Sequence, residues 1–208
     1  MGLIFTQVQL MKVNEILHAK TLSDAEESEI LDVDKTNKTK VHHVDNYILY
    51  TYIDSDGLNV YFLEDEDETT IAATYAKRIT INNKEYLQPL NVAVLDEFKG
   101  NRLAGQMYVT ISWKNKMPII SDIMQTESGR KLWFNINKTV GSRMYVINVN
   151  SGKKISNDIN DAYTDWLNEP AGLQTALVFE SDVNRIRVIG KDVKIFNQPK
   201  FSKYDNVL

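Results

Sequence analysis

The turn from Lys99 to Ala104 is the part of this sequence whose residues are best suited to chemistry. It consists of Lys99, Gly100, Asn101, Arg102, Leu103 and Ala104. Where a strand leads through a glycine-containing turn into a helix, the first helical N–H groups stay unpaired and the positive end of the helix dipole points outward. Lys99 and Arg102 add positive charge at the same point. The turn therefore predicts an anion site, which suits a phosphate or diphosphate better than a neutral ligand.

The segments around this turn have the periodicities needed to position it. Apolar residues recur on one face of a helix expected at about 101–113. Strands are expected at 46–53, 58–63, 69–81, 86–95, 117–123, 143–149, 173–179, 185–189 and 193–196, and further helices at 7–19, from about 126, and at 159–167. The acidic stretch 23–34 is expected to be a solvated helix and loop. The strand–helix–strand–helix–strand order in the middle implies at least one crossover connection with parallel pairing.

The composition describes an ordinary globular protein. The 208 residues are 43% hydrophobic and 25% charged, which fits one domain, or one domain with an appendage. The absence of cysteine excludes a disulfide scaffold, a thiolate zinc site and a Cys nucleophile. A net charge of −4 argues against bulk electrostatic coating of nucleic acid. Without a long apolar window or a signal peptide pattern, we expect a cytoplasmic protein with no membrane partner.

The turn resembles the nucleotide-binding motif of the GNAT family of acyl-CoA-dependent N-acetyltransferases. In that family a strand is followed by Arg/Gln-x-x-Gly-x-Gly/Ala at the start of a helix. Here Lys99 replaces the usual Arg or Gln, and Arg102 replaces the central glycine. A second segment, Ile120 to Trp133, looks like a strand-to-helix segment of small phage-encoded GNAT-like proteins. The resemblance covers roughly residues 46–150.

This resemblance implies an α/β (mixed α+β) fold. Its expected core is a GNAT-like bent mixed sheet with helices on both faces, followed by a C-terminal helix and β-hairpin. Residues 1–150 would form the acyl-CoA-binding domain. Residues 151–208 would form a C-terminal extension packed on the same domain.

The resemblance also implies acetyl-CoA as co-substrate. The turn amides would hold the diphosphate of CoA, and backbone N–H groups of the splayed strand around Val94 and Leu95 would stabilise the thioester oxygen. The family often has a tyrosine that protonates the departing thiolate. At the corresponding place this chain has Trp133 and Phe134, and neither side chain can supply that proton.

If the chain is such an enzyme, Asp122 is the first candidate for the catalytic base, because it lies at an expected strand end beside the proposed site. Gln125 lies close enough in sequence to orient an acceptor. A plainer role for Asp122, as a helix cap or a surface group, stays open. No metal site is expected, because His42 and His43 are adjacent and would lie on opposite faces of a strand.

Two functions follow from these observations. The first is transfer of an acetyl group from acetyl-CoA to an amine of an unidentified acceptor, such as a host protein, a tRNA or a modified base. The alternative is a catalytically degenerate GNAT-like phage protein that binds a partner, as a host modulator or virion component. The basic segment 184–204 is either a solvated hairpin and tail or a docking surface for nucleic acid or an acidic protein.

Overall fold

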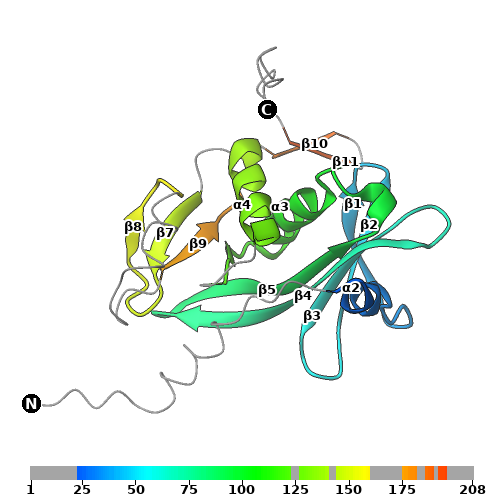
Figure 1. Ribbon diagram of the computed structural model, residues 1–208, viewed down its shortest axis with the longest axis horizontal. Coiled ribbons are helices and arrows are strands. Elements are labelled where there is room, and N and C mark those ends of the chain that lie inside the picture. Colours follow the sequence, from blue (N-terminus) through cyan, green and yellow to red (C-terminus); the bar gives the residue numbers. More distant parts are fainter. Residues whose placement is uncertain are drawn as a thin grey trace, which may run out of the picture.

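The computed structural model describes residues 23–122, 127–140, 144–159, 175–181, 186–189 and 192–195. These residues form a mixed α/β fold in which an 11-stranded sheet has the order β10-β11-β1-β2-β3-β4-β5-β6-β9-β7-β8. The strands are β1 (Thr39–Val44), β2 (Tyr47–Ile53), β3 (Asn59–Glu64), β4 (Thr70–Ile81), β5 (Lys84–Val94), β6 (Ile119–Ile120), β7 (Met144–Asn148), β8 (Lys154–Ser156), β9 (Thr175–Phe179), β10 (Ile186–Ile189) and β11 (Asp192–Ile195). The helices are α2 (Asp24–Leu31), η1 (Asp96–Phe98), α3 (Leu103–Asn115) and α4 (Glu127–Val140). Figure 1 shows β7, β8 and β9 at one end of the sheet and β1, β2, β10 and β11 at the other.

The central strands β2 to β5 form successive antiparallel hairpins, as the sequence predicts. Asn82 and Asn83 form the turn between β4 and β5, and both residues take the positive φ angles that asparagine tolerates in tight hairpin turns. Side chains of β3 alternate between two buried faces, with Val60 and Phe62 in one apolar cluster and Tyr61 and Leu63 in the other. The middle of the sheet is therefore covered on both faces.

Helix α2 covers one of these faces. Its N-terminus is fixed by a capping box, in which the Ser23 side chain accepts a hydrogen bond from the Glu26 backbone and the Glu26 side chain accepts one from the Ser23 backbone. The helix packs on β4 and β5. Ile30 and Val33 are buried against the sheet. The acidic stretch thus begins with a helix, as expected, but it is not only solvated, because Ile30 in the helix and Val33 just after it are buried.

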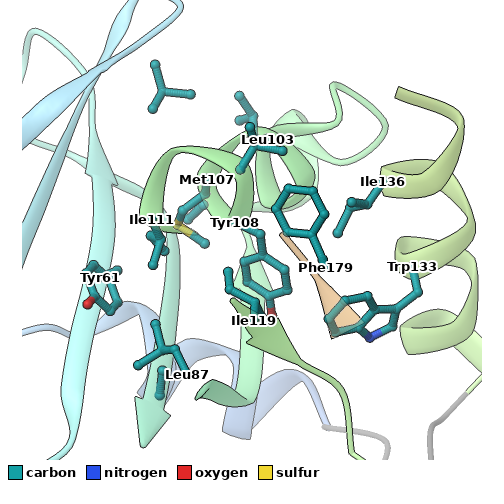
Figure 2. Packing of buried hydrophobic residues seen from close by; sticks show 14 of the residues in the cluster. Tyr61, Leu87, Leu103, Met107, Tyr108, Ile111, Ile119, Trp133, Ile136 and Phe179 are labelled. Atoms are coloured by element: carbon teal, nitrogen blue, oxygen red, sulfur yellow. The ribbon is translucent and has the colours of Figure 1, made fainter. Parts of the chain in front are cut away.

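Helices α3 and α4 cover the opposite face and lie side by side (Figure 1). Figure 2 shows Leu103, Met107, Tyr108 and Ile111 of α3 buried in the core, with Trp133 and Ile136 of α4 close to Phe179 of β9. The Tyr108 and Trp133 rings are 6.3 Å apart between centroids. The expected helix at 101–113 is confirmed, with a start two residues later at Leu103.

The predicted parallel pairing is also confirmed, because α3 connects β5 to β6 and Leu87 pairs in parallel with Ile119. Strand β9 inserts between β6 and β7, so residues of the expected C-terminal extension contribute to the central sheet. The expected β-hairpin is formed by β10 and β11. The expected helix at 7–19 lies outside the described residues, as does the expected helix at 159–167 apart from its first residue. Within the described ranges, no helix has the length and apolar character needed to span a membrane.

Candidate functional site

The turn before α3 holds two residues, Gly100 and Arg102, in the left-handed backbone region. Gly100 has a φ of +89°, and a Cβ added there would meet no atom within 4 Å. Arg102 caps the helix in the left-handed conformation, with φ 60° and ψ 17°, and makes no side-chain cap hydrogen bond. The resemblance places a glycine at that position, and the arginine adopts the left-handed backbone that glycine favours. The turn is thus open to solvent, and its first helical N–H groups lack a side-chain cap.

The remaining residues of the turn divide between core and surface. Leu103 is buried in the core, Ala104 is half-buried, and Asn101 is exposed. Lys99 lies between two carboxylates, with its Nζ 2.7 Å from Asp96 Oδ1 and 2.9 Å from Glu27 Oε2. Hydrogen bonds to Asp96 and Glu27 raise the pKa of Lys99, so it is charged at neutral pH. The lysine that was expected to face a diphosphate is therefore held by acids, one of which belongs to α2.

Strands β5 and β6 pair in parallel at Leu87 and Ile119 and separate after this pair. We call the place where they separate the fork. The amide of Ser121 donates to the Leu177 carbonyl at 2.8 Å, and the Ser121 hydroxyl accepts from the Leu177 amide at 3.0 Å. The chain after β6 therefore follows β9, while β5 continues along β4 to Val94. In the part of the chain that the structure describes, no strand pairs with β5 on the fork side after Leu87.

The two backbone amides expected to bind a thioester oxygen differ in their surroundings. The Leu95 amide donates a hydrogen bond to the Ile71 carbonyl at 2.9 Å, so this N–H already has a partner. Successive amides of a strand point to opposite sides, so the Val94 amide points away from β4, toward the open edge of β5. Of the two, only Val94 has an N–H that faces this edge.

A β-bulge, which the sequence did not indicate, interrupts β5 near the fork. Tyr75 of β4 pairs with Asn91 and Ala76 pairs with Pro89, so Leu90 is the extra residue and is 38% exposed. Bulges bend a strand and redirect the groups around them. This one lies on the open edge of β5, between the fork and Val94.

Asp122 closes the fork from the β6 side. Its Oδ1 accepts a hydrogen bond from Gln88 Nε2 of β5 at 2.7 Å. Burial raises the pKa of Asp122 to about 7, although the hydrogen bond from Gln88 and the charge of Lys77 act in the opposite direction. Gln88 is 0% exposed, and its Oε1 has no hydrogen-bond partner among the described residues. The fork therefore holds a carboxyl group that titrates near neutrality beside a buried hydrogen-bond acceptor.

Tyr108 of α3 reaches the same place from the helix side. It is 3% exposed, and burial raises the pKa of its hydroxyl; the charge of Asp122 adds to this increase, and a hydrogen bond with Thr74 opposes it. The helical spacing of apolar residues places Tyr108 on the core-facing side of the helix expected at 101–113. Its ring does lie in the core, but its hydroxyl joins the polar groups of the fork.

The other predicted residues are placed as follows. Gln125 lies outside the described residues. Trp133 is 5% exposed and Phe134 is packed against the core, so both serve as apolar contacts of α4. Gln88, Thr74 and Tyr108 were missed as site residues. A glutamine inside an otherwise apolar strand was the one signal in the sequence that could have found the fork.

Comparison with known proteins gives limited further information. No protein-family model matches the chain, and no curated protein matches it by sequence. Among solved structures, the chain is similar to one described as the NatB acetyltransferase complex bound to CoA and MES, with 11% identity and a TM-score of 0.34. The match covers 85% of this chain and 95% of the other.

Proposed function

We propose that this protein is an acyl-CoA-dependent N-acetyltransferase that acetylates an amine of an as yet unidentified acceptor. One observation carries the proposal: the open edge of β5 runs from the fork, where Gln88 meets Asp122, to Val94, and the chain then reaches the turn at Gly100 through the short helix η1. Anion-binding, strand-pairing and proton-accepting groups thus follow one another along a single path. This order matches the order of the chemical groups in acetyl-CoA.

The residues present fit that molecule at three points. The uncapped N–H groups at the start of α3 suit its diphosphate. Its pantetheine arm carries amides, which can pair with an open strand edge as an added strand does. From Val94 to Gln88 the edge spans about 20 Å, at roughly 3.3 Å per residue. An arm laid along it would bring the thioester to the fork, where the buried Gln88 Oε1 can accept from an N–H donor.

Acetyl-CoA would supply an acetyl group that is activated as a thioester. In the reaction, the amine nitrogen forms a bond to the acetyl carbon, the bond from that carbon to sulfur breaks, and the amine loses a proton. Asp122, with a pKa of about 7, is ionised in about half of the molecules at neutral pH and can accept that proton. The outward-facing Val94 amide lies about 20 Å from the fork, so it would pair with an amide of the pantetheine arm rather than with the thioester oxygen. The thiolate then takes up a proton to give free CoA.

A second candidate function is favoured by Trp133 and Phe134. Because α4 offers no hydroxyl at the position where the family often has a tyrosine, this second candidate is a binding protein that retains CoA without turnover. Its partner would be a protein or a nucleic acid, with the basic segment 184–204 as the docking surface. Of that segment, the structure describes only the backbone of β10 and β11.

Thermal unfolding with and without ligand tests the proposal. A ligand that binds only the folded state stabilises it by about 2.7 kcal/mol at a hundred times its dissociation constant. We therefore expect the melting temperature to rise with millimolar acetyl-CoA, and we expect pantetheine alone, which lacks the diphosphate, to have little effect. Absence of any shift with acetyl-CoA and with CoA contradicts the proposal. Release of free thiol in the presence of a primary amine separates the enzyme from the binding protein.

A further inference from the structure

At the bulge, two side chains take over the hydrogen bonds of the β4–β5 ladder. The Thr74 hydroxyl donates to the Asn91 backbone carbonyl at 2.5 Å, and the Tyr75 amide donates to Asn91 Oδ1 at 3.2 Å. Both carbonyl groups of Asn91 are thus bound by consecutive residues of β4. Thr74 is 1% exposed, so its hydroxyl acts away from water.

These bonds determine where the extra residue of β5 lies. A strand with a bulge can in principle relax by moving the bulge along its partner, which reverses the faces of the residues in between. Asn91 cannot move along β4 without losing the bonds from Thr74 and Tyr75. The bulge is therefore fixed at Leu90, and the open edge of β5 is fixed with it.

The same hydroxyl connects β4 to α3. The Thr74 side chain also forms a hydrogen bond with Tyr108, and this bond lowers the pKa of the Tyr108 hydroxyl. Tyr108 lies on the helix whose first turn is the anion site, five residues after Leu103. Thr74 therefore connects the helix of the turn to the bulged strand at the fork.

We propose that Thr74 is a positioning residue for the acyl end of acetyl-CoA: with Asn91 and Tyr108 it holds the bulge of β5 so that the open edge presents the thioester to the fork. This inference rests on the proposed function. Leu90 lies four residues from Val94, about 13 Å along the strand and away from the turn. Loss of the Thr74 hydroxyl should therefore affect the acetyl end of the ligand and leave its diphosphate in place.

The chain offers matched variants for the test. Thr74→Val removes the hydroxyl at constant shape, and Thr74→Ser retains it. Thr70→Val is the control, because Thr70 is also buried on β4 but its hydroxyl has no hydrogen-bond partner among the described residues. The measurements are the dissociation constants of acetyl-CoA and of CoA by calorimetry, and the ¹³C chemical shift of the labelled acetyl carbonyl of bound acetyl-CoA.

We expect Thr74→Val to weaken acetyl-CoA binding about tenfold while CoA binding stays within about twofold. The bound carbonyl resonance should shift toward its position in free solution, and Thr74→Ser and Thr70→Val should resemble the wild type. An equal loss for both ligands, or no loss for either, overturns the inference, because Thr74 would then be structural only. If the wild type binds neither ligand, the proposed function itself fails, and that result is distinguishable from the other two.

Discussion

The turn before α3 and the fork between β5 and β6 differ in how the chain builds them. The turn is six consecutive residues, and the groups that we propose to bind the ligand there are backbone amides without a side-chain cap. The fork collects Thr74, Gln88, Tyr108 and Asp122 from four separate segments and buries them. A local feature can thus provide charge complementarity, but a carboxyl with a pKa near neutrality requires burial, which only the assembled fold supplies.

The difference also predicts how each region fails. At the turn, function depends on φ angles, so a backbone change is the most damaging. At the fork, function depends on a carboxyl that burial makes costly to ionise, so its removal should stabilise the fold while it removes the chemistry. The two regions can therefore be separated by substitutions that act on binding or on stability.

The largest effect is expected from Gly100→Pro. Proline fixes φ near −65°, but Gly100 has a φ of +89°, and proline also removes an amide donor from the turn. We expect CoA affinity to fall at least about a hundredfold, in line with roughly 3 kcal/mol for a misplaced proline. Isothermal titration calorimetry with CoA measures it.

Gly57→Pro is the control for this substitution. Gly57 also has a positive φ, +80°, and open surroundings, but it lies in the β2–β3 turn. The Gly57→Pro substitution should lower the melting temperature without a specific loss of CoA affinity. Unchanged CoA binding by the folded Gly100→Pro variant would mean that the diphosphate is held elsewhere. The turn would then not be a binding region.

A smaller effect, on stability, is expected from Asp122→Asn. The pKa of Asp122 is raised from 3.8 to about 7 by burial, so the folded state binds the proton more tightly than the unfolded state. The free energy of unfolding of the wild type therefore falls as the pH rises from about 4 to about 7. Above pH 7 the contribution of Asp122 to it no longer changes with pH. The total loss of stability from Asp122 over this pH range is at most about 4 kcal/mol, at 1.36 kcal/mol per pKa unit.

Asparagine has no charge to bury, so the Asp122→Asn variant should gain stability over the wild type across that pH window. Melting temperatures from pH 4 to pH 8 measure this, with the exposed turn residue in Asp56→Asn as the control. CoA affinity should change by less than about twofold, because the turn is untouched. A constant difference between variant and wild type at every pH would show that Asp122 does not titrate in this range.

Much of the fold was accessible from local patterns, whereas the fork was not. The central hairpins, the Asn82-Asn83 turn, α3 and the parallel crossover each have a periodicity or turn chemistry of their own. The short strands β1 and β8 were missed, because few apolar residues mark them. Asp122 was named from its place at a strand end. Its contact with Gln88, 34 residues earlier, depends on strand pairing that no local pattern encodes.

The smallest effect is expected where α2 meets the turn, at the ion pair between Glu27 and Lys99. A diphosphate at the turn competes with Glu27 for the lysine, so Glu27→Gln should strengthen CoA binding. Lys99 is 48% exposed, and exposed ion pairs contribute about 0–1 kcal/mol, so the gain should be about two- to fivefold and should shrink at high salt.

Glu29→Gln removes an exposed acid from the same helix and controls for net charge. Calorimetric titration with CoA at low and high salt distinguishes the two variants. Equal gains for both would indicate a general charge effect, whereas weaker CoA binding by Glu27→Gln would mean that Glu27 holds Lys99 in position for the ligand. In that last case the turn would resemble the fork after all, because it too would depend on a residue that lies far away in the sequence.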